Sequence, residues 1–336
     1  MVPFLAQSSL GKTSTGSGRN KKIVKPKRLS KGDTVGIIAP SGGLVSDAFD
    51  RAVKNLEDLG FKTKVGKSAR GKLSRFSATD QERLDDLHWA FTDSEVDAIW
   101  CLRGGYGAMR LLPKIDFKLI KKNPKIVIGF SDITALHLAI SQNTGLVTFH
   151  GPVASSTYSD YTRKHVENIL MNPTAPYRIE LSPDNQVKTS TLYKTEVITK
   201  GKCQGQLIGG NLSLLAALSG TPFGLKNMKG KLLFIEEVNE QPYRVDRMLT
   251  QLRQSVDLHS LAGIAVGVFE DSSPEEKQSS QPVLEVLKDT LGDLGIPVIY
   301  GLSFGHIRDQ FTLPIGIEAE LDTENALITF LETAVI

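Results

Sequence analysis

Through residues 32–152, stretches with the hydrophobic pattern of a strand alternate with stretches that have the hydrophobic pattern of a helix. Short apolar runs rich in β-branched residues predict strands at 34–42, 96–105, 125–131 and 146–152. Apolar residues at helical spacing predict helices between them, at 46–60, 79–93 and 132–145. Strands that alternate with helices of this length are typical of an α/β fold, with a parallel sheet and helices on both faces.

Capping residues mark the ends of two predicted helices. Thr79 and Glu82 have the spacing of a capping box, while Ser46 stands at an N-cap position and Gly60 at a C-terminal stop. Ligands of parallel sheets bind beyond the carboxyl ends of the strands. Four turns fall at such ends, with the sequences APSGG, RGGYG, GFSD and FHGP. We therefore expect the chemistry to converge on these turns.

The second half of the chain is less regular. Residues 153–200 contain scattered Pro, Asn and Ser and one predicted helix near 161–171, and we interpret them as a linker or crossover. Residues 201–336 mix strands with helices, including a helix at 282–295 and a final hairpin at 317–331. The predicted organisation is an N-terminal domain at 32–152 and a C-terminal domain at 201–336.

Charge separates the N-terminal tail from the body. The formal net charge is +3, but residues 1–31 carry eight basic and no acidic residues, which leaves −5 for the rest. A mildly acidic body disfavours nucleic acid as the main partner. The tail is rich in Ser, Gly and Lys, which predicts disorder or a targeting segment. Since no apolar run reaches the ~18–20 residues of a membrane span, we expect a cytoplasmic protein, with organelle targeting by the tail as the alternative.

Metal and cofactor signatures are missing from the sequence. The two cysteines, Cys101 and Cys203, make neither a disulfide framework nor a metal knuckle, and Cys101 lies in an apolar run that predicts a buried thiol. The six histidines show no metal-binding spacing. No Walker loop is present, and RGGYG is not a dinucleotide fingerprint. We therefore expect no metal and no cofactor.

Ser131 stands where a buried strand turns into a helix. Such a corner suits a nucleophile, because it exposes Oγ and directs helical N–H groups at the same point. It suits a helix N-cap equally well. Gly129 fits a crowded elbow, but Ile133 breaks the GxSxG pattern of α/β-hydrolases. From the turn alone, both interpretations stay open.

Two later strand ends carry residues that could activate a serine. The apolar run before Glu236 and Glu237 places these side chains on opposite faces, so one can enter a site while the other meets solvent or a basic neighbour. His306 follows another strand. The alternatives are a strand-end ion pair of Glu236 with Arg244 or Arg247, and an ordinary loop histidine. A serine nucleophile needs a histidine base oriented by a carboxylate, which these residues can supply.

Seven ordered motifs resemble the LD-carboxypeptidase family. They are GDTVGIIAPSG, RGGYGAMRLLPKID, GFSDITAL, TFHGP, GGNLSLLAALSGTP, LFIEEVNEQPYRVDRML and GLSFGHIRDQFTLPIG, and they extend from about residue 32 to about residue 333. This family comprises muramoyltetrapeptide carboxypeptidases and relatives that give immunity to peptide–nucleotide antibiotics. Only the basic tail departs from it.

The resemblance implies a serine peptidase with Ser131 as nucleophile, Glu236 as acid and His306 as base. It implies a flavodoxin-like N-terminal domain and a swivelling-type β/α C-terminal domain, with the site between them and a homodimer as the common assembly. The implied reaction releases terminal D-Ala from a cell-wall (murein) tetrapeptide, at the bond that follows the L-centre of a diamino acid.

Five further residues are candidates for binding the oxyanion or the substrate. Backbone N–H groups of Asp132 and Gly105 would meet the oxyanion, although RGGYG could simply be a tight turn. Arg103 and Arg244 could bind the substrate carboxylate, but Arg244 could equally pair with Glu240. Asn211 could bind peptide or cap a helix.

Three rival functions differ in what they require of the chain. An immunity-type hydrolase would take its specificity from loops, above all residues 153–200. A binding module without catalysis would not need the three triad residues. A glutamine-amidotransferase-like enzyme would need a cysteine where Ser131 stands.

Overall fold

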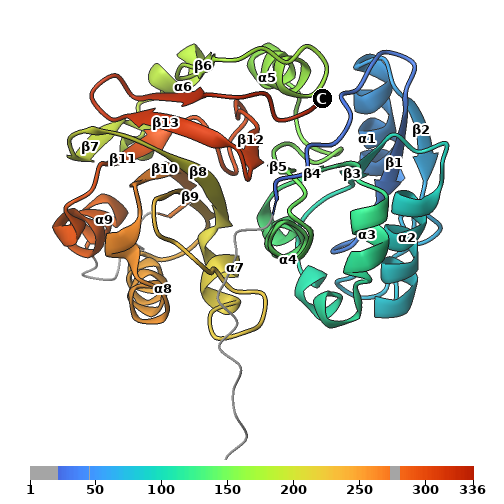
Figure 1. Ribbon diagram of the computed structural model, residues 1–336, viewed down its shortest axis with the longest axis horizontal. Coiled ribbons are helices and arrows are strands. Elements are labelled where there is room, and N and C mark those ends of the chain that lie inside the picture. The colour runs from blue at the N-terminus through green and yellow to red at the C-terminus, as the bar shows by residue number, and fades with distance from the viewer. Residues whose placement is uncertain (1–21, 45, 273–280) are drawn as a thin grey trace, which may run out of the picture.

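The structure is a computed structural model that describes residues 22–44, 46–272 and 281–336. Two sheets lie side by side, each with its own helices (Figure 1). The predicted two-domain α/β fold is confirmed, with a mostly parallel N-terminal sheet and a mixed C-terminal sheet.

The N-terminal sheet has the strand order β12-β5-β4-β3-β1-β2. Its strands are β1 (Thr34–Ile38), β2 (Lys62–Val65), β3 (Ala98–Cys101), β4 (Ile126–Gly129), β5 (Thr148–His150) and β12 (Leu313–Ile315). The first five pair in parallel in the order 2-1-3-4-5, which is that of flavodoxin-like sheets. β12 comes from the far end of the chain and pairs antiparallel with β5.

Alternating side chains give this sheet two buried faces. In β3, Ile99 and Cys101 belong to one hydrophobic cluster, whereas Ala98 and Trp100 belong to the other. The first face packs against α2 (Asp80–Thr92), α3 (Phe117–Lys122) and α4 (Thr134–Thr144), and the second against α1 (Ser46–Asp58) and α5 (Asp160–Leu170). The predicted burial of the Cys101 thiol and the predicted capping box of Thr79 and Glu82 are both confirmed.

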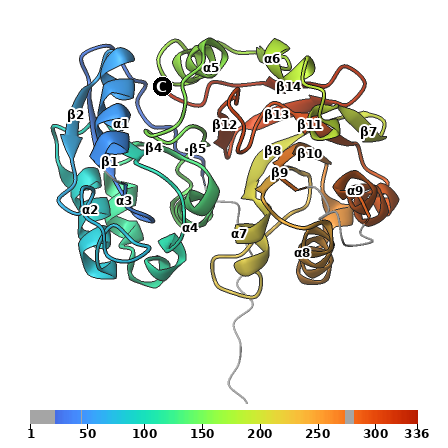
Figure 2. The same cartoon turned by 180° about the vertical axis from the view of Figure 1, so that it is seen from behind.

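The C-terminal sheet has the order β6-β14-β13-β8-β9-β10-β11-β7. Its strands are β6 (Tyr177–Ile179), β7 (Glu196–Thr199), β8 (Lys202–Asn211), β9 (Lys231–Val238), β10 (Gly263–Glu270), β11 (Val298–Leu302), β13 (Glu318–Asp322) and β14 (Leu327–Phe330). The four central strands β8–β11 are parallel and the outer pairs antiparallel. α7 (Leu212–Ala217), α8 (Pro242–Ser255) and α9 (Val283–Leu291) lie along one face (Figure 1 and Figure 2).

The remaining helical elements are short. They are α6 (Pro183–Gln186) and the 3₁₀ helices η1 (Ala108–Arg110), η2 (Leu112–Lys114), η3 (Ser131–Ile133), η4 (Thr191–Tyr193), η5 (Leu258–Ser260) and η6 (Gly292–Leu294). The helix predicted at 132–145 therefore begins as a 3₁₀ turn, η3, before it continues as α4. No helix of the described ranges is both long and apolar enough to cross a membrane.

Three chain segments tie the two halves together. β12 adds a C-terminal strand to the N-terminal sheet, and residues 153–200 contain α5 and α6 together with β6 and β7, which join the C-terminal sheet. Residues 22–31 lie against the body, where Val24 bridges Leu146 and Lys25 pairs with Glu332 at 2.6 Å. The ordered chain thus begins before Gly32, whereas residues 1–21 of the predicted tail lie outside the described residues.

Arg83 on α2 links two of the turns at the carboxyl ends of the strands. Its side chain is fully buried and donates to the carbonyl oxygens of Pro40, after β1, and Gly107, after β3. It also donates to Asp80 at 2.6 Å. Since a buried carbonyl without a donor is costly, Arg83 stabilises both turns at once.

Replacing this buried arginine should therefore destabilise the fold. We expect Arg83→Leu to lower the free energy of unfolding by about 2–5 kcal/mol, because two buried carbonyls lose their donor. Arg110→Leu is the matched control, since Arg110 also binds Asp80 but is exposed and screened by solvent. Urea titration of both variants measures the difference, and equal effects would contradict this role of Arg83.

Candidate active site

Ser131 occupies a strained turn directly after β4. Its φ is +65°, a left-handed conformation that is uncommon for residues other than glycine. Phe130, not Ser131, takes the N-cap position of η3, and no side chain caps that turn. The N-cap interpretation of Ser131 is therefore wrong. The conformation matches that of a nucleophile elbow, where strain holds Oγ away from the sheet.

Gly104 lies against the Ser131 side chain. A Cβ added to Gly104 would stand 2.9 Å from Cβ and 3.1 Å from Oγ of Ser131. Only a glycine therefore lets the RGGYG turn approach the serine this closely. Gly105, the candidate oxyanion donor, is the next residue and has a φ of +111°.

Asp132 joins three of the four strand-end turns through its carboxylate. Oδ2 accepts a hydrogen bond from the Ser41 hydroxyl at 2.5 Å and another from the Ala108 backbone N–H at 2.8 Å. Burial raises the pKa of Asp132, and these two bonds partly oppose that rise. The carboxylate is committed to structure, which leaves the backbone N–H of Asp132 as its candidate catalytic group.

Glu236 and His306 form a buried hydrogen-bonded pair. Nδ1 of His306 lies 2.7 Å from Oε2 of Glu236, whose side chain has no solvent exposure. Gly305 makes this approach possible, since a Cβ there would lie 3.1 Å from the Glu236 carboxylate. Glu236 therefore pairs with His306, and the alternative of an ion pair with an arginine is wrong.

Burial and pairing act in opposite directions on the two groups. Burial favours the neutral form of Glu236, but the charge and hydrogen bond of His306 outweigh it and lower the pKa of Glu236. For His306, burial lowers the pKa, while the Glu236 carboxylate outweighs burial and raises it. Glu236 therefore stays ionised and makes the imidazole a stronger base.

Phe130 brings the serine turn and the acid–base pair together. Its ring centroid lies 4.7 Å from that of His306, and Ser131 is the next residue in the chain. A second link crosses the domains nearby, where the backbone N–H of Asn211 donates to the Thr134 hydroxyl at 3.0 Å. Asn211 is also the register partner of Glu236. The three triad candidates thus lie around one junction between the two sheets.

His150 was not among the predicted site residues. It is buried at the end of β5, with Nε2 4.0 Å from Oε1 of Glu236. Burial lowers the pKa of His150 to about 4, so the ring is neutral near pH 7. Neither its nitrogens nor Oε1 of Glu236 has a hydrogen-bond partner within the described residues. The sequence signal that could have identified His150 as a site residue is its place in the strand-end motif FHGP.

Two other candidates have structural partners. Asn211 caps α7 by accepting from the Leu214 N–H at 3.3 Å, and its amide donates to Glu237 at 2.9 Å. Glu237 is buried at 2% exposure and accepts from the Ser213 N–H, so the prediction that it meets solvent or a basic neighbour is wrong. Arg244 is exposed and pairs with Glu240 at 3.4 Å, the alternative left open by the sequence.

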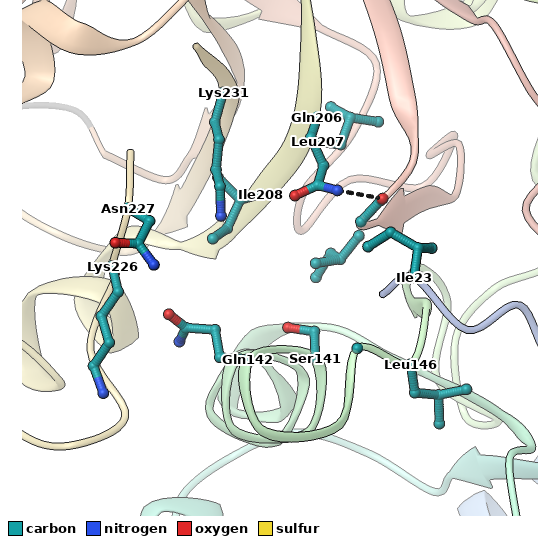
Figure 3. A pocket seen from close by; sticks show the side chains of 13 residues that line it. Ile23, Ser141, Gln142, Leu146, Gln206, Leu207, Ile208, Lys226, Asn227 and Lys231 are labelled. Atoms are coloured by element: carbon teal, nitrogen blue, oxygen red, sulfur yellow. Dashed lines mark hydrogen bonds between the residues drawn. The ribbon is translucent and has the colours of Figure 1, made fainter. Parts of the chain in front are cut away.

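Two hollows are relevant to the choice of a substrate site. One, of about 510 Å³, is lined by Arg103 and Gly105, the residues on either side of Gly104. The other, of about 230 Å³, lies at the C-terminal end of α4 between Gln142 and Lys231 (Figure 3). None of the candidate catalytic residues lines the second hollow. The first includes Gly105, the candidate oxyanion donor, although Ser131, Glu236 and His306 do not line it.

Comparison with known proteins identifies the family. The LD-carboxypeptidase N-terminal domain matches residues 35–151 and the LD-carboxypeptidase C-terminal domain matches residues 204–321. The chain belongs to the LD-carboxypeptidase family and is a serine-type hydrolase of that family, as the seven motifs predicted.

Individual relatives cover nearly the whole chain. The "Probable murein peptide carboxypeptidase" of Bacillus subtilis is 42% identical over 304 residues, which are 89% of this chain and 92% of that protein. The murein tetrapeptide carboxypeptidase of Pseudomonas aeruginosa is 32% identical and covers 86% of this chain and 92% of its own. The structure of MccF in complex with glutamyl sulfamoyl guanosine superposes with a TM-score of 0.84 at 27% identity. The superposition covers 93% of this chain and 99% of that chain.

The contact between Gly104 and Ser131 predicts a selective loss of reactivity. Gly104→Ala should slow labelling of Ser131 by a fluorophosphonate roughly 10- to 100-fold, because the new methyl group displaces Oγ. Gly292→Ala is the control, since the nearest atom to its added Cβ is 3.7 Å away. Labelling that survives in Gly104→Ala would contradict the close approach.

The pair of Glu236 and His306 predicts a pH profile. A base must be neutral to accept a proton, so the labelling rate should rise with pH and reach half its plateau above pH 6.5, the ordinary pKa of histidine. Glu236→Gln removes the charge that raises this pKa, so the profile should move to lower pH and the plateau should fall. In the control Glu320→Gln, on β13, the profile should stay in place. A shift to higher pH in Glu236→Gln would refute the assignment.

Proposed function

We propose that this protein is a serine LD-carboxypeptidase that releases terminal D-Ala from murein tetrapeptides by means of Ser131, His306 and Glu236. The observation that carries the proposal is the buried bond between His306 and Glu236 beside a serine at φ +65°. The names of the relatives from Bacillus subtilis and Pseudomonas aeruginosa support the substrate class. A homodimer and a cytoplasmic location stay predictions.

Acylation follows from the roles of the three side chains. Nε2 of His306 takes the proton of Ser131 Oγ as this oxygen attacks the scissile carbonyl, and Glu236 stabilises the resulting imidazolium. The N–H groups of Asp132 and Gly105 donate to the oxyanion, and one such donor is worth roughly 3–4 kcal/mol of barrier. The tetrahedral intermediate collapses as the C–N bond breaks and His306 gives its proton to the leaving amine of D-Ala.

Deacylation repeats these steps with water. His306 removes a proton from the water that attacks the acyl-enzyme ester, and the same donors stabilise the second oxyanion. Cleavage of the ester bond returns the proton to Ser131 Oγ and releases the shortened peptide. The substrate and one water molecule are consumed, the tripeptide and D-Ala are released, and the three side chains return to their starting protonation states.

Release of D-Ala tests the proposed function. The protein should convert L-Ala–γ-D-Glu–meso-diaminopimelate–D-Ala to the tripeptide and D-Ala, measured by mass spectrometry. Ser131→Ala should reduce the rate by about 10³-fold or more, since the nucleophile is lost. Absence of release by the wild type, or equal release by the variant, would contradict the proposal.

A second function is favoured by the likeness to MccF. That structure holds glutamyl sulfamoyl guanosine, so hydrolysis of an acyl-sulfamoyl nucleoside is the alternative for this chain. Glutamyl sulfamoyl adenosine assayed beside the tetrapeptide distinguishes the two. The proposed function predicts the higher kcat/KM for the tetrapeptide.

A further inference from the structure

The hollow lined by Arg103 and Gly105 lies at the switch point of the N-terminal sheet. β1 pairs with β2 on one side and with β3 on the other, so the strand order reverses there. Open α/β sheets bind ligands beyond the carboxyl ends of such strands. The hollow is lined by Gly42, which follows β1, and by Arg103 and Gly105, which follow β3. Its position is therefore that of a ligand site.

Positive charge gathers in this hollow without compensation. Lys72, Arg75 and Arg103 line it, and within the described chain no acidic residue does. None of the three has an ion pair among the described residues, and the Arg103 guanidinium donates to the carbonyl oxygen of Gly43 at 3.2 Å. Residues 32–336 carry a net charge of −5, so the charge of this basic cluster is opposite in sign to the net charge of the body. Its field favours an anion.

The RGGYG turn connects the hollow to the nucleophile. Arg103 and Gly105 are the neighbours of Gly104, which contacts Ser131. Two residues that line the hollow are therefore the direct chain neighbours of a residue that packs against the serine. In a peptide whose scissile carbonyl is at Ser131, the group one residue further on is the carboxylate of the residue that will be released.

We propose that this hollow binds the free C-terminal carboxylate of the substrate and that Lys72 and Arg75 act with Arg103 in recognising it. The inference rests on the proposed function and deepens it. An arginine fork matches a carboxylate with two parallel hydrogen bonds, and a lysine adds a point charge. Arg244 does not line this hollow and pairs with Glu240 instead. Because only the last residue of a peptide has this carboxylate, such binding restricts cleavage to the last peptide bond.

Tyr106 also lines the hollow. Its ring is 54% exposed and stacks on Phe76 with centroids 5.7 Å apart. Phe76 is held in turn by the guanidinium groups of Arg83 and Arg110. These contacts hold Tyr106 in place as part of the wall of the hollow.

A comparison of acid and amide substrates tests the assignment. The tetrapeptide and its C-terminal amide differ only in the charge that the hollow is proposed to bind. In the wild type, kcat/KM should be higher for the acid. Arg75→Gln and Lys72→Gln should each lower it for the acid by about tenfold, mainly through KM, and leave the amide unchanged. Lys231→Gln, which alters a lysine that lines the other hollow, is the matched control and should change neither.

Binding to Ser131→Ala separates this inference from the proposed function. Calorimetric titration with acid and amide needs no turnover, and the acid should bind at least tenfold more tightly until Lys72 and Arg75 are both replaced by Gln. Equal affinities, undetectable binding of the acid, or variants that affect acid and amide alike would overturn the inference. Release of D-Ala together with equal affinities would leave the proposed function standing while this site fails.

Discussion

A fully buried carboxylate constrains the architecture of this protein. Glu236 has no exposure to solvent, so its charge is tolerable only with a partner that compensates for lost hydration. His306 supplies that compensation at 2.7 Å, and Gly305 lets the loop come close enough. The pairing raises the basicity of an imidazole that would otherwise lose its proton on burial. The same interaction therefore stabilises the charge of Glu236 and strengthens His306 as a base.

Two sheets are needed to complete the arrangement. The acid–base pair belongs to the C-terminal sheet, whereas Ser131 is held by the N-terminal one in a conformation that costs free energy. Asp132 secures that turn through Ser41 and Ala108, and the bond between Asn211 and Thr134 fixes it to the C-terminal sheet. β12, which crosses from one half of the chain to the other, resists separation of the two halves. Strain at the serine is thus supported by contacts from both domains.

The sequence predicts much of the fold because strand and helix periods are local properties. It also places Ser131 and Glu236 at strand ends, since an apolar run that stops at a polar residue is visible in one dimension. It does not reveal that Gly104 contacts the serine, because that depends on how two turns meet. The burial of Glu237 depends on the N-terminus of α7, a different element. Lys72 and Arg75 lie in an exposed loop without periodicity, so only the folded chain shows that they join Arg103.

The central claim is that Glu236 holds His306 as a strong base. Nuclear magnetic resonance of selectively labelled histidine tests it most directly, by following the ring nitrogens of His306 as a function of pH. We expect a midpoint above 6.5 in the wild type and a lower midpoint in Glu236→Gln. A midpoint at or below 6.5 in the wild type, or one that Glu236→Gln leaves unchanged, would contradict it.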